Sequence, residues 1–448
     1  FMIELNPNRR KGEFSVTFQI LIAILMMAAI IILLFKEVSP PGVIFTAVPI
    51  LAALLMGYSP REINGFIGDG LKSISGTLFL MVFAVLYFGI LHEAGVFQAL
   101  VCFVMHFLGN SVLGTLIVTC FVGMGTQLDG SGATTALCTI PAMKPIYDRQ
   151  KIRPEALLLI ESLASGVFCL LPWAPGIVEG SAYVGVDVFD VFTIILPVLI
   201  FSVILLLLFC LPVSIVEKRH GAGLSSDEFA DLKKQISQPV SYPFGKKIAM
   251  FDALLTLAVM ILLLSGNVPS TFAFGLGFGV LLIVNYRTVQ AQRDYIKRQA
   301  PTTLNMVFTL LGVAVLVGVN NGTGELKALA ELIVAHVSPS VLSHLPFLLC
   351  VISLPLSITL GGSKNSIVLP AIIPMVTSLG FTPEQVFGTV FACGVISANL
   401  SLFNAAPYLA LGLAEVEMKD HLRYSLLPVY AFSLLMLAFM VISGILPI

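Results

Sequence analysis

Apolar runs of about 20 residues, long enough to cross a bilayer, recur along this chain of 448 residues. Short polar stretches separate them, and much of the charge is gathered in residues 217 to 247 and 287 to 298. Hydrophobic residues make up 57% of the chain and charged residues only 11%, whereas a soluble domain has about 25% charged residues. The pattern predicts an all-α polytopic membrane protein and argues against a soluble enzyme.

The charge and the cysteine content exclude further classes of protein. The formal net charge is -1, so the chain lacks the basic surface that nucleic-acid binding requires. The seven cysteines lie in apolar segments, and the sequence has neither a CxxC pair nor a Cys/His cluster with metal-ligand spacing. We therefore expect free thiols that fill apolar space, and no nucleic-acid partner.

The first half of the chain contains four apolar runs that predict uninterrupted spanning helices. They cover residues 16 to 35, 40 to 57, 74 to 91 and 190 to 216. The polar stretch 58 to 73 is expected to separate two of them. Residues 95 to 108 are too few to span comfortably and have helical apolar spacing, which predicts an interfacial helix. The first run lacks a small-residue cleavage site before or after it, so we expect a retained helix rather than a signal peptide.

Two further apolar stretches of this half are interrupted by residues that a lipid-facing helix would not tolerate. The run QLDGSG at 127 to 132 interrupts the stretch 111 to 147, which predicts a re-entrant hairpin with a buried polar tip. In the stretch 155 to 188, Pro172 and Pro175 remove backbone donors and leave carbonyls without helical partners. This stretch is expected to form a discontinuous helix, split near the middle of the membrane.

The same order of segments recurs after a polar linker at 217 to 249. It comprises spans near 250 to 266, 269 to 286 and 302 to 321, an amphipathic piece at 324 to 337, a hairpin at about 341 to 378, a discontinuous helix at about 383 to 417 and a last span at 422 to 446. Matching residues keep an offset of 229 to 232: Gly89 and Gly318, Gly130 and Gly362, Pro154 and Pro383, Pro175 and Pro407, Leu196 and Leu427. So steady an offset indicates an internal duplication, with residues 1 to 216 as the first repeat and 250 to 448 as the second.

Each repeat then has five spanning helices, one re-entrant hairpin and one discontinuous helix. Because five is an odd number, the two repeats must have inverted topology. With the linker in the cytoplasm, seventeen Lys and Arg residues fall inside and six outside, in line with the positive-inside rule. This orientation places the N-terminus outside, and we expect an integral protein of a bacterial inner membrane.

Irregular backbone at membrane depth survives only where protein or a wet cavity surrounds it. The repeat relates the two hairpin tips and the two split helices pairwise, so these segments should converge near the middle of the membrane. Free N–H groups at half-helix N-termini can bind an anion there, and carbonyls or hydroxyls can bind a small cation. The candidates for substrate binding are Ser131, Gly132, Thr134, Ser363, Asn365, Ser366 and Asn404, and Thr135 is a candidate for a coupling ion. Alternatively, the Gly and Ser residues only allow tight turns.

Ionisable residues within apolar segments are costly, so each is a candidate for function. Lys364 in the second tip is predicted to pair with an anionic substrate, or alternatively with a carboxylate such as Asp129. Asp129, Glu161 and Glu179 can bind a coupling proton or cation, and Glu179 is also a candidate for substrate binding. Glu161 could instead cap a helix locally.

Three strings in these segments resemble the citrate-metal/proton symporter family (CitMHS) of the ion transporter superfamily. They are LDGSGATT at 128 to 135, LPWAPG at 171 to 176 and GLAEVEMKDHLRYSL at 412 to 426. The resemblance extends along nearly the whole chain and implies a secondary symporter that takes up small polycarboxylates, usually with a divalent metal and driven by protons. It also implies a scaffold domain, a transport domain that moves like an elevator, and a homodimer.

The sequence departs from the family pattern at two places. Where the family commonly carries an Arg after the split of the first discontinuous helix, this chain reads GIVEG at 176 to 180. The second tip reads GGSKNS at 361 to 366 instead of the SNDAFY type. One Lys and one Glu suit a mono- or dicarboxylate, with an amine or hydroxyl that Glu179 recognises, better than a trianion.

Two functional classes stay open at this point. The first is a cation-coupled symporter of a small organic carboxylate, which would move with a proton, a sodium ion or a divalent metal. The second is a cation/proton antiporter without an organic substrate, in which Asp129, Glu161 and Glu179 carry the exchange. A membrane enzyme has little support because the sequence has no HExxH, GxSxG or P-loop pattern, and no cofactor is expected.

Overall fold

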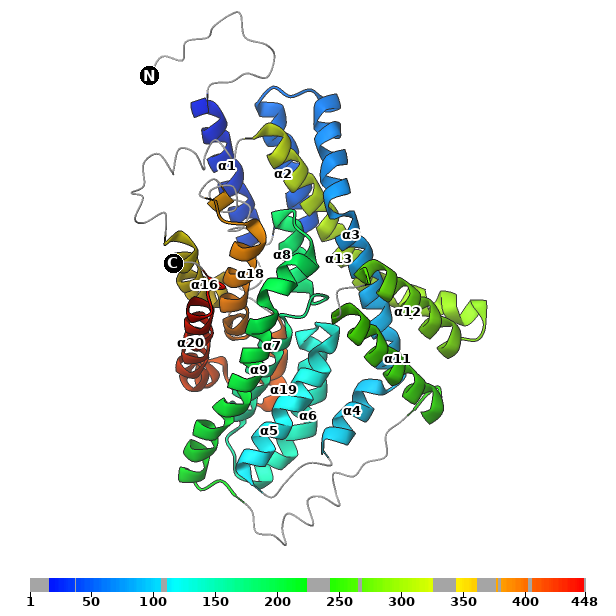
Figure 1. Cartoon of the computed structure of the whole chain (residues 1–448), viewed down its shortest axis with the longest axis vertical. Helices are drawn as coiled ribbons and strands as arrows, with labels where there is room; N and C mark the ends of the chain where they lie inside the picture. Colours follow the sequence, from blue (N-terminus) through cyan, green and yellow to red (C-terminus); the bar gives the residue numbers. More distant parts are fainter. Residues whose placement is uncertain are drawn as a thin grey trace, which may run out of the picture.

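The arrangement of the helices comes from a computed structural model (Figure 1). It describes residues 16–36, 38–105, 111–223, 242–264, 268–324, 344–360, 376–377, 380–401 and 405–446. Every regular element within these ranges is a helix, which confirms the all-α prediction. The predicted amphipathic piece after Gly324 and half of the predicted second hairpin, including its tip at 361 to 366, lie outside the described residues.

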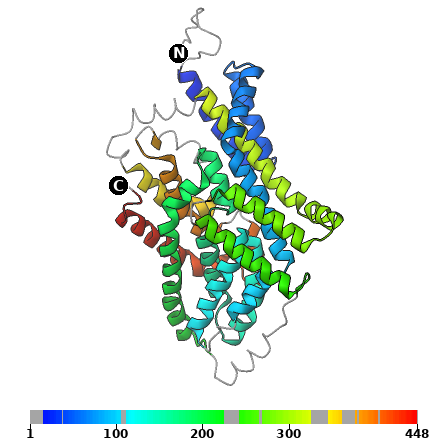
Figure 2. The ribbon, with the colours of Figure 1, turned by 45° about the vertical axis from the view of Figure 1, so that its right-hand side comes forward.

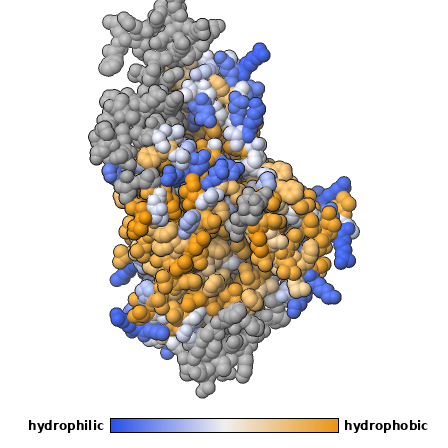
Figure 3. Space-filling model, viewed as in Figure 1, coloured by the Kyte–Doolittle hydropathy of each residue, from blue (hydrophilic) through white to orange (hydrophobic). Residues whose placement is uncertain are grey.

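The surface and the helix lengths show an integral membrane protein. On the face seen in Figure 3, apolar side chains cover a broad area across the middle, and polar side chains gather above it, below it and at its right-hand edge. Within the described ranges, five helices are long and apolar enough to cross a membrane. They are Pro60–Glu93, Val112–Asp129, Val188–Arg219, Thr303–Thr323 and Met418–Ile442.

Two long helices, α3 (Pro60–Glu93) and α13 (Val289–Thr323), pack along each other (Figure 2). Glycine permits this contact: a Cβ on Gly70 would lie 2.0 Å from the carbonyl oxygen of Ala314. A Cβ on Gly318 would lie 2.1 Å from a carbonyl oxygen of α3. Small residues at such a crossing let two backbones approach closely in a membrane.

Four shorter helices surround this pair. Helix α2 (Pro41–Leu55) packs against α13, and α12 (Ser270–Asn285) packs against α3. Helix α1 (Val16–Phe35) then covers α2, and α11 (Lys246–Leu264) covers α12. Both halves of the chain thus contribute helices to this part of the molecule.

The start of α3 differs from the prediction, because the helix includes residues 60 to 73 of the polar stretch 58 to 73, which was expected to separate two spans. Ser59 and Glu62 form a capping box: the Glu62 N–H donates to the Ser59 hydroxyl at 3.3 Å, and the Ser59 N–H donates to the Glu62 carboxylate at 2.8 Å. Helix α13 likewise begins well before the predicted residue 302, after a Thr288 N-cap. Capping extends both helices beyond their apolar parts.

The remaining helices form a second group (Figure 1). They are α4 (Val96–Met105), α5 (Val112–Thr126), α6 (Gly132–Arg149), α7 (Pro154–Phe168), α8 (Pro175–Val184), α9 (Val188–Arg219), α16 (Leu345–Leu360), α18 (Pro383–Val395), α19 (Ala405–Ala414) and α20 (Met418–Ile442). Helix α7 lies at their centre, because its residues 156–167 are all buried and it packs against α5, α6, α9 and α20. The seven cysteines are all free thiols, as the sequence predicts.

Three breaks in this group position the candidate site. A short 3-10 turn, η1 (Gln127–Asp129), joins α5 to α6. Residues 169–174 leave the helical path between α7 and α8, and a second turn, η2 (Ile396–Leu400), follows α18. The first two breaks coincide with the Gly, Pro and polar residues noted in the sequence. The turn η2 comes before Pro407, the residue that the repeat pairs with Pro175. The re-entrant course of the hairpin and the inverted topology stay predictions.

Candidate functional site

The turn between α5 and α6 forms the first tip, residues 129 to 135. Gly130 has φ +74, a left-handed conformation that glycine adopts without strain. The Ser131 N–H donates to the Asp129 carboxylate at 2.8 Å, and the Ser131 hydroxyl accepts from the Thr134 N–H at 3.3 Å. Asp129 and Ser131 therefore stabilise the turn and cap α6, as the tight-turn alternative expects.

This tip lies between the two broken helices. A Cβ on Gly130 would be only 2.5 Å from the ring of Pro175, the first residue of α8. A Cβ on Gly132, the first residue of α6, would be 3.3 Å from the Cβ of Ala406, near the start of α19. The N-termini of α6, α8 and α19 therefore meet at one place.

Hydrogen bonds tie the tip to the first broken helix. The indole N–H of Trp173 donates to the carbonyl of Leu128 at 2.8 Å. The side-chain oxygen of Gln127 accepts from the hydroxyls of Thr135 and Ser165, the latter at 2.8 Å. Gln127 is fully buried, so its amide holds the tip and α7 in a fixed relation.

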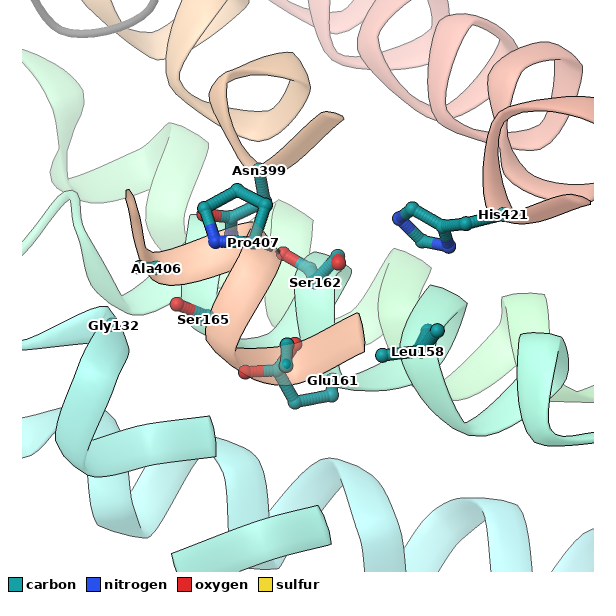
Figure 4. Close-up of a pocket in the computed structure, with 10 residues that line it drawn as sticks. Gly132, Leu158, Glu161, Ser162, Ser165, Asn399, Ala406, Pro407 and His421 are labelled. Carbon is teal, nitrogen blue, oxygen red and sulfur yellow. Dashed lines mark hydrogen bonds between the residues drawn. The ribbon is translucent and has the colours of Figure 1, made fainter. Parts of the chain in front are cut away.

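A small pocket opens beside the tip (Figure 4). Its polar lining comes from four elements: Glu161, Ser162 and Ser165 of α7, Asn399 of η2, His421 of α20 and the backbone of Gly132. Ala406, Pro407 and Ala410 of α19 and Leu158 of α7 complete it. The pocket has room for about one water molecule, so it fits a proton carrier or a small ion rather than an organic acid.

Comparison with known proteins identifies the family. The profile of the citrate transporter family, CitMHS, matches residues 14–297, which is more than half of the chain. The chain belongs to the CitMHS family. It is therefore a membrane transporter and not an enzyme, and the resemblance seen in the sequence is confirmed.

Two relatives from Bacillus subtilis (strain 168) support this placement along most of the chain. The "Citrate transporter" is 27% identical over 410 residues, which cover 91% of this chain and 94% of the relative. The "Mg(2+)/citrate complex secondary transporter" is 24% identical over 383 residues, which cover 84% and 87%.

A solved structure supports the fold. The YdaH transporter of Alcanivorax borkumensis, reported to have an unusual topology, matches with a TM-score of 0.59 over 96% of this chain and 98% of that one. The two sequences are 14% identical, so the likeness concerns the fold alone.

The site residues predicted from the sequence of this CitMHS chain lie at different places in the structure. Gly132 and Glu161 line the pocket, whereas Ser131, Thr134 and Thr135 lie at the tip beside it. Glu179 lies on α8, which packs against α3, α13 and α18, and it does not line this pocket. Ser363, Lys364, Asn365, Ser366 and Asn404 lie outside the described residues. Their roles in binding stay predictions.

Five polar side chains of the pocket region were not predicted as site residues from the sequence: Gln127, Ser162, Ser165, Asn399 and His421. Gln127 was noted only as part of a polar run, and His421 only as part of the string at 412 to 426. The Asn399 amide donates to the carbonyl of Ser162 at 2.9 Å, which joins the second break to α7. Among the described residues, no three His, Cys, Asp or Glu side chains gather as a metal site.

One ion-pair network lies on the linker side of the pocket. The Arg153 guanidinium donates to the buried Glu217 carboxylate at 2.7 Å and lies 4.8 Å from the ring centre of Tyr424. The Tyr424 hydroxyl also donates to Glu217, at 2.8 Å. The hydrogen bonds with Glu217 raise the pKa of Arg153. Because Glu217 is close to the end of α9, the network marks the side on which the predicted linker begins.

Proposed function

We propose that this chain is a secondary active symporter that moves a small organic carboxylate together with a cation. The observation that carries the proposal is the meeting of three helix N-termini, those of α6, α8 and α19, within an apolar helix group. Each N-terminus brings the positive end of a helix dipole to this place, although the Ser131 hydroxyl already caps α6 and Pro175, the first residue of α8, has no N–H. Together they favour a bound anion.

The substrate class follows from the family and from the residues that differ from its pattern. The two Bacillus subtilis relatives are named for citrate and for a Mg(2+)/citrate complex. This supports a citrate-like or dicarboxylate substrate for this chain. Lys364 would supply its positive partner, and Ser131, Thr134 and Asn404 would supply polar contacts. The co-transported cation would be a proton, a sodium ion or a divalent metal.

Reciprocal packing supports two inverted repeats. Helix α2 packs on α13 and its counterpart α12 packs on α3, while α9 packs on α18 and its counterpart α20 packs on α7. Such exchange is what a pseudo-two-fold axis produces. The helices around α3 and α13 would form the scaffold, and those around α7 the transport domain. We further propose a homodimer in a bacterial inner membrane, with the linker in the cytoplasm.

An elevator movement would slide α8 past α2. The rings of Phe45 on α2 and Tyr183 on α8 meet edge to face, with centroids 5.7 Å apart. Cysteines at both positions, in a background without the seven native cysteines, should stop uptake when a short bifunctional reagent joins them. In the matched control, cysteines replace Tyr87 on α3 and Phe274 on α12, whose ring centroids are 5.6 Å apart. Cross-linking this second pair should leave uptake intact. Uptake that survives the first cross-link would exclude this movement.

Ligand binding can be followed through Trp173, because it is the only tryptophan in the chain and donates to the backbone of the tip. Titration of purified protein with mono-, di- and tricarboxylates should change its fluorescence for the bound class and raise the apparent Tm. Sodium and magnesium are added separately to each series. A silent panel, together with transport driven by pH and salt gradients alone, would favour the cation/proton antiporter.

Lys364 has its own test. Lys364→Ala should abolish saturable uptake of the carboxylate while the protein remains folded, because the variant removes the cation that pairs with the substrate. Thermal unfolding without ligand provides the folding control. Unchanged uptake would remove Lys364 from the site.

A further inference from the structure

Two titratable side chains face the small pocket from different helices (Figure 4). Glu161 on α7 is 4% exposed and His421 on α20 is 2% exposed. The imidazole Nδ1 lies 3.2 Å from the hydroxyl of Ser425, so Nε2 is the nitrogen left for the pocket. Both groups can hold or release a proton.

We infer that Glu161 and His421 exchange the coupling proton across this pocket, and that His421 passes it to the linker side. The inference rests on the proposed function. It adds His421 to the site and names the two side chains that carry the proton.

The environment of Glu161 favours proton uptake over a permanent charge. Among the described residues, Glu161 has no ion pair. A carboxylate buried without a cation carries a large desolvation cost. The pocket has room for about one water molecule, which can bridge the carboxyl group and the imidazole.

Substrate binding and proton binding are coupled through the same pocket. Gly132, the first residue of α6, lines the pocket together with Glu161. An anion held at this helix N-terminus disfavours a second negative charge nearby, so it favours the protonated form of Glu161. By linkage, the proton favours the anion equally, which is the requirement for symport.

His421 lies at the linker-side end of this route. It is the fourth residue of α20, next to the exposed Asp420, and Tyr424 one turn further contacts Glu217 near the end of α9. In the transfer step, the O–H bond of Glu161 breaks and an N–H bond forms at Nε2, through the bridging water. The products are a carboxylate and an imidazolium ion, which then gives its proton to water on the linker side.

Other titratable groups lie on the helices packed against this pair, and those among the described residues do not line the pocket. They are Cys120, Asp129, Cys138, Lys144, Tyr147, Asp148, Arg149, Arg153, Glu155, Cys169, Asp190, Cys210, Glu217, Lys218, Arg219, Cys350, Glu384, Cys393, Tyr408, Glu415, Lys419, Asp420, Arg423, Tyr424 and Tyr430. Of these, Lys144 pairs with Asp148 and Glu415, and Arg153 pairs with Glu217. Within the part of the chain that the structure describes, Glu161 and His421 are the two titratable side chains of the pocket lining.

The test separates substrate exchange from proton-driven accumulation in proteoliposomes, with the carboxylate that the binding panel identifies. Exchange moves substrate both ways without net proton transfer, whereas accumulation under a pH gradient needs it. Glu161→Gln should retain exchange and lose accumulation, because the amide mimics the protonated acid. His421→Gln should also retain exchange, but lose net proton-driven flux and its dependence on the pH of the linker side.

A buried carboxyl elsewhere provides the matched control. Asp252 on α11 is fully buried, and Asp252→Asn should leave exchange and accumulation as in the unmodified protein. Accumulation retained by Glu161→Gln would overturn the inference while the carboxylate transporter stands. Loss of exchange in that variant, or accumulation driven by sodium alone, would overturn it too. If the unmodified protein exchanges no carboxylate, the proposed function itself fails.

Discussion

Gly130 offers the most direct test of the meeting of helix N-termini, because an alanine there has two separate costs. Its φ of +74 is unfavourable for any residue with a Cβ, by about 1 to 2 kcal/mol. The added Cβ would also lie 2.5 Å from the Pro175 ring and 3.1 Å from the Cα of Ala174. Displacing these packed atoms costs a further 1 to 3 kcal/mol, roughly. We expect Gly130→Ala to destabilise the protein by both amounts and to move the tip away from α8.

An alanine at Gly185 measures the cost of the left-handed backbone conformation alone. Gly185 has the same φ of +74, but a Cβ there would lie 4.0 Å from its nearest neighbour, a methyl group of Val317. Gly185→Ala should therefore show only the loss of about 1 to 2 kcal/mol that the left-handed backbone causes. The difference between the two variants measures the contact between the tip and the broken helix.

The assay is thermal unfolding of both variants in detergent at one scan rate, with and without the carboxylate that binds the unmodified protein. Gly130→Ala should unfold at the lower temperature and lose the ligand-induced shift, whereas Gly185→Ala should keep that shift. If the two variants unfold alike and bind alike, the tip does not depend on its contact with α8. The anion site formed by the helix N-termini would then lose its main support.

Three further changes probe the bonds around the site, each read from the apparent Tm. Gln127→Leu removes the acceptor of two buried hydroxyls and should destabilise the protein by about 1 to 3 kcal/mol. An unchanged Tm would show that Gln127 does not hold the tip against α7. Trp173→Phe keeps a ring in place but loses the bond to the Leu128 carbonyl, for about 1 kcal/mol, with substrate affinity as a second readout. Arg153→Ala leaves the Glu217 carboxylate buried without its cation and should cost about 3 kcal/mol; an unchanged Tm would show that the pair is not needed for folding.

The sequence predicted the local features of this fold because each depends on residues close in the chain. Hydropathy located the spanning segments, and Gly and Pro located the breaks near Gly130 and Pro175. Hydropathy missed the polar start of α3, where a capping box and a proline extend the helix. A length of helix outside the apolar run leaves no signal in hydropathy.

The pocket could not be predicted in the same way. Glu161 stood out because a carboxyl group in an apolar helix is rare. His421 did not, because its place beside Glu161 comes from the packing of α20 on α7, between residues far apart in the sequence. Gln127 was equally inconspicuous, since its role depends on partners on two different helices.

The bonds that hold the candidate site lie within one group of helices. Gln127 joins the tip to α7, Trp173 joins the first break to the tip, and Asn399 joins the second break to α7. None of these bonds involves α3 or α13, which hold each other through the glycine crossing at Gly70 and Gly318. Since the crossing brings backbone against backbone, those two helices cannot slide along each other without separating. The candidate site is held by bonds within its own group of helices, so its geometry can stay the same while that group moves relative to α3 and α13. The proposed elevator mechanism requires two helix groups that are held separately in this way.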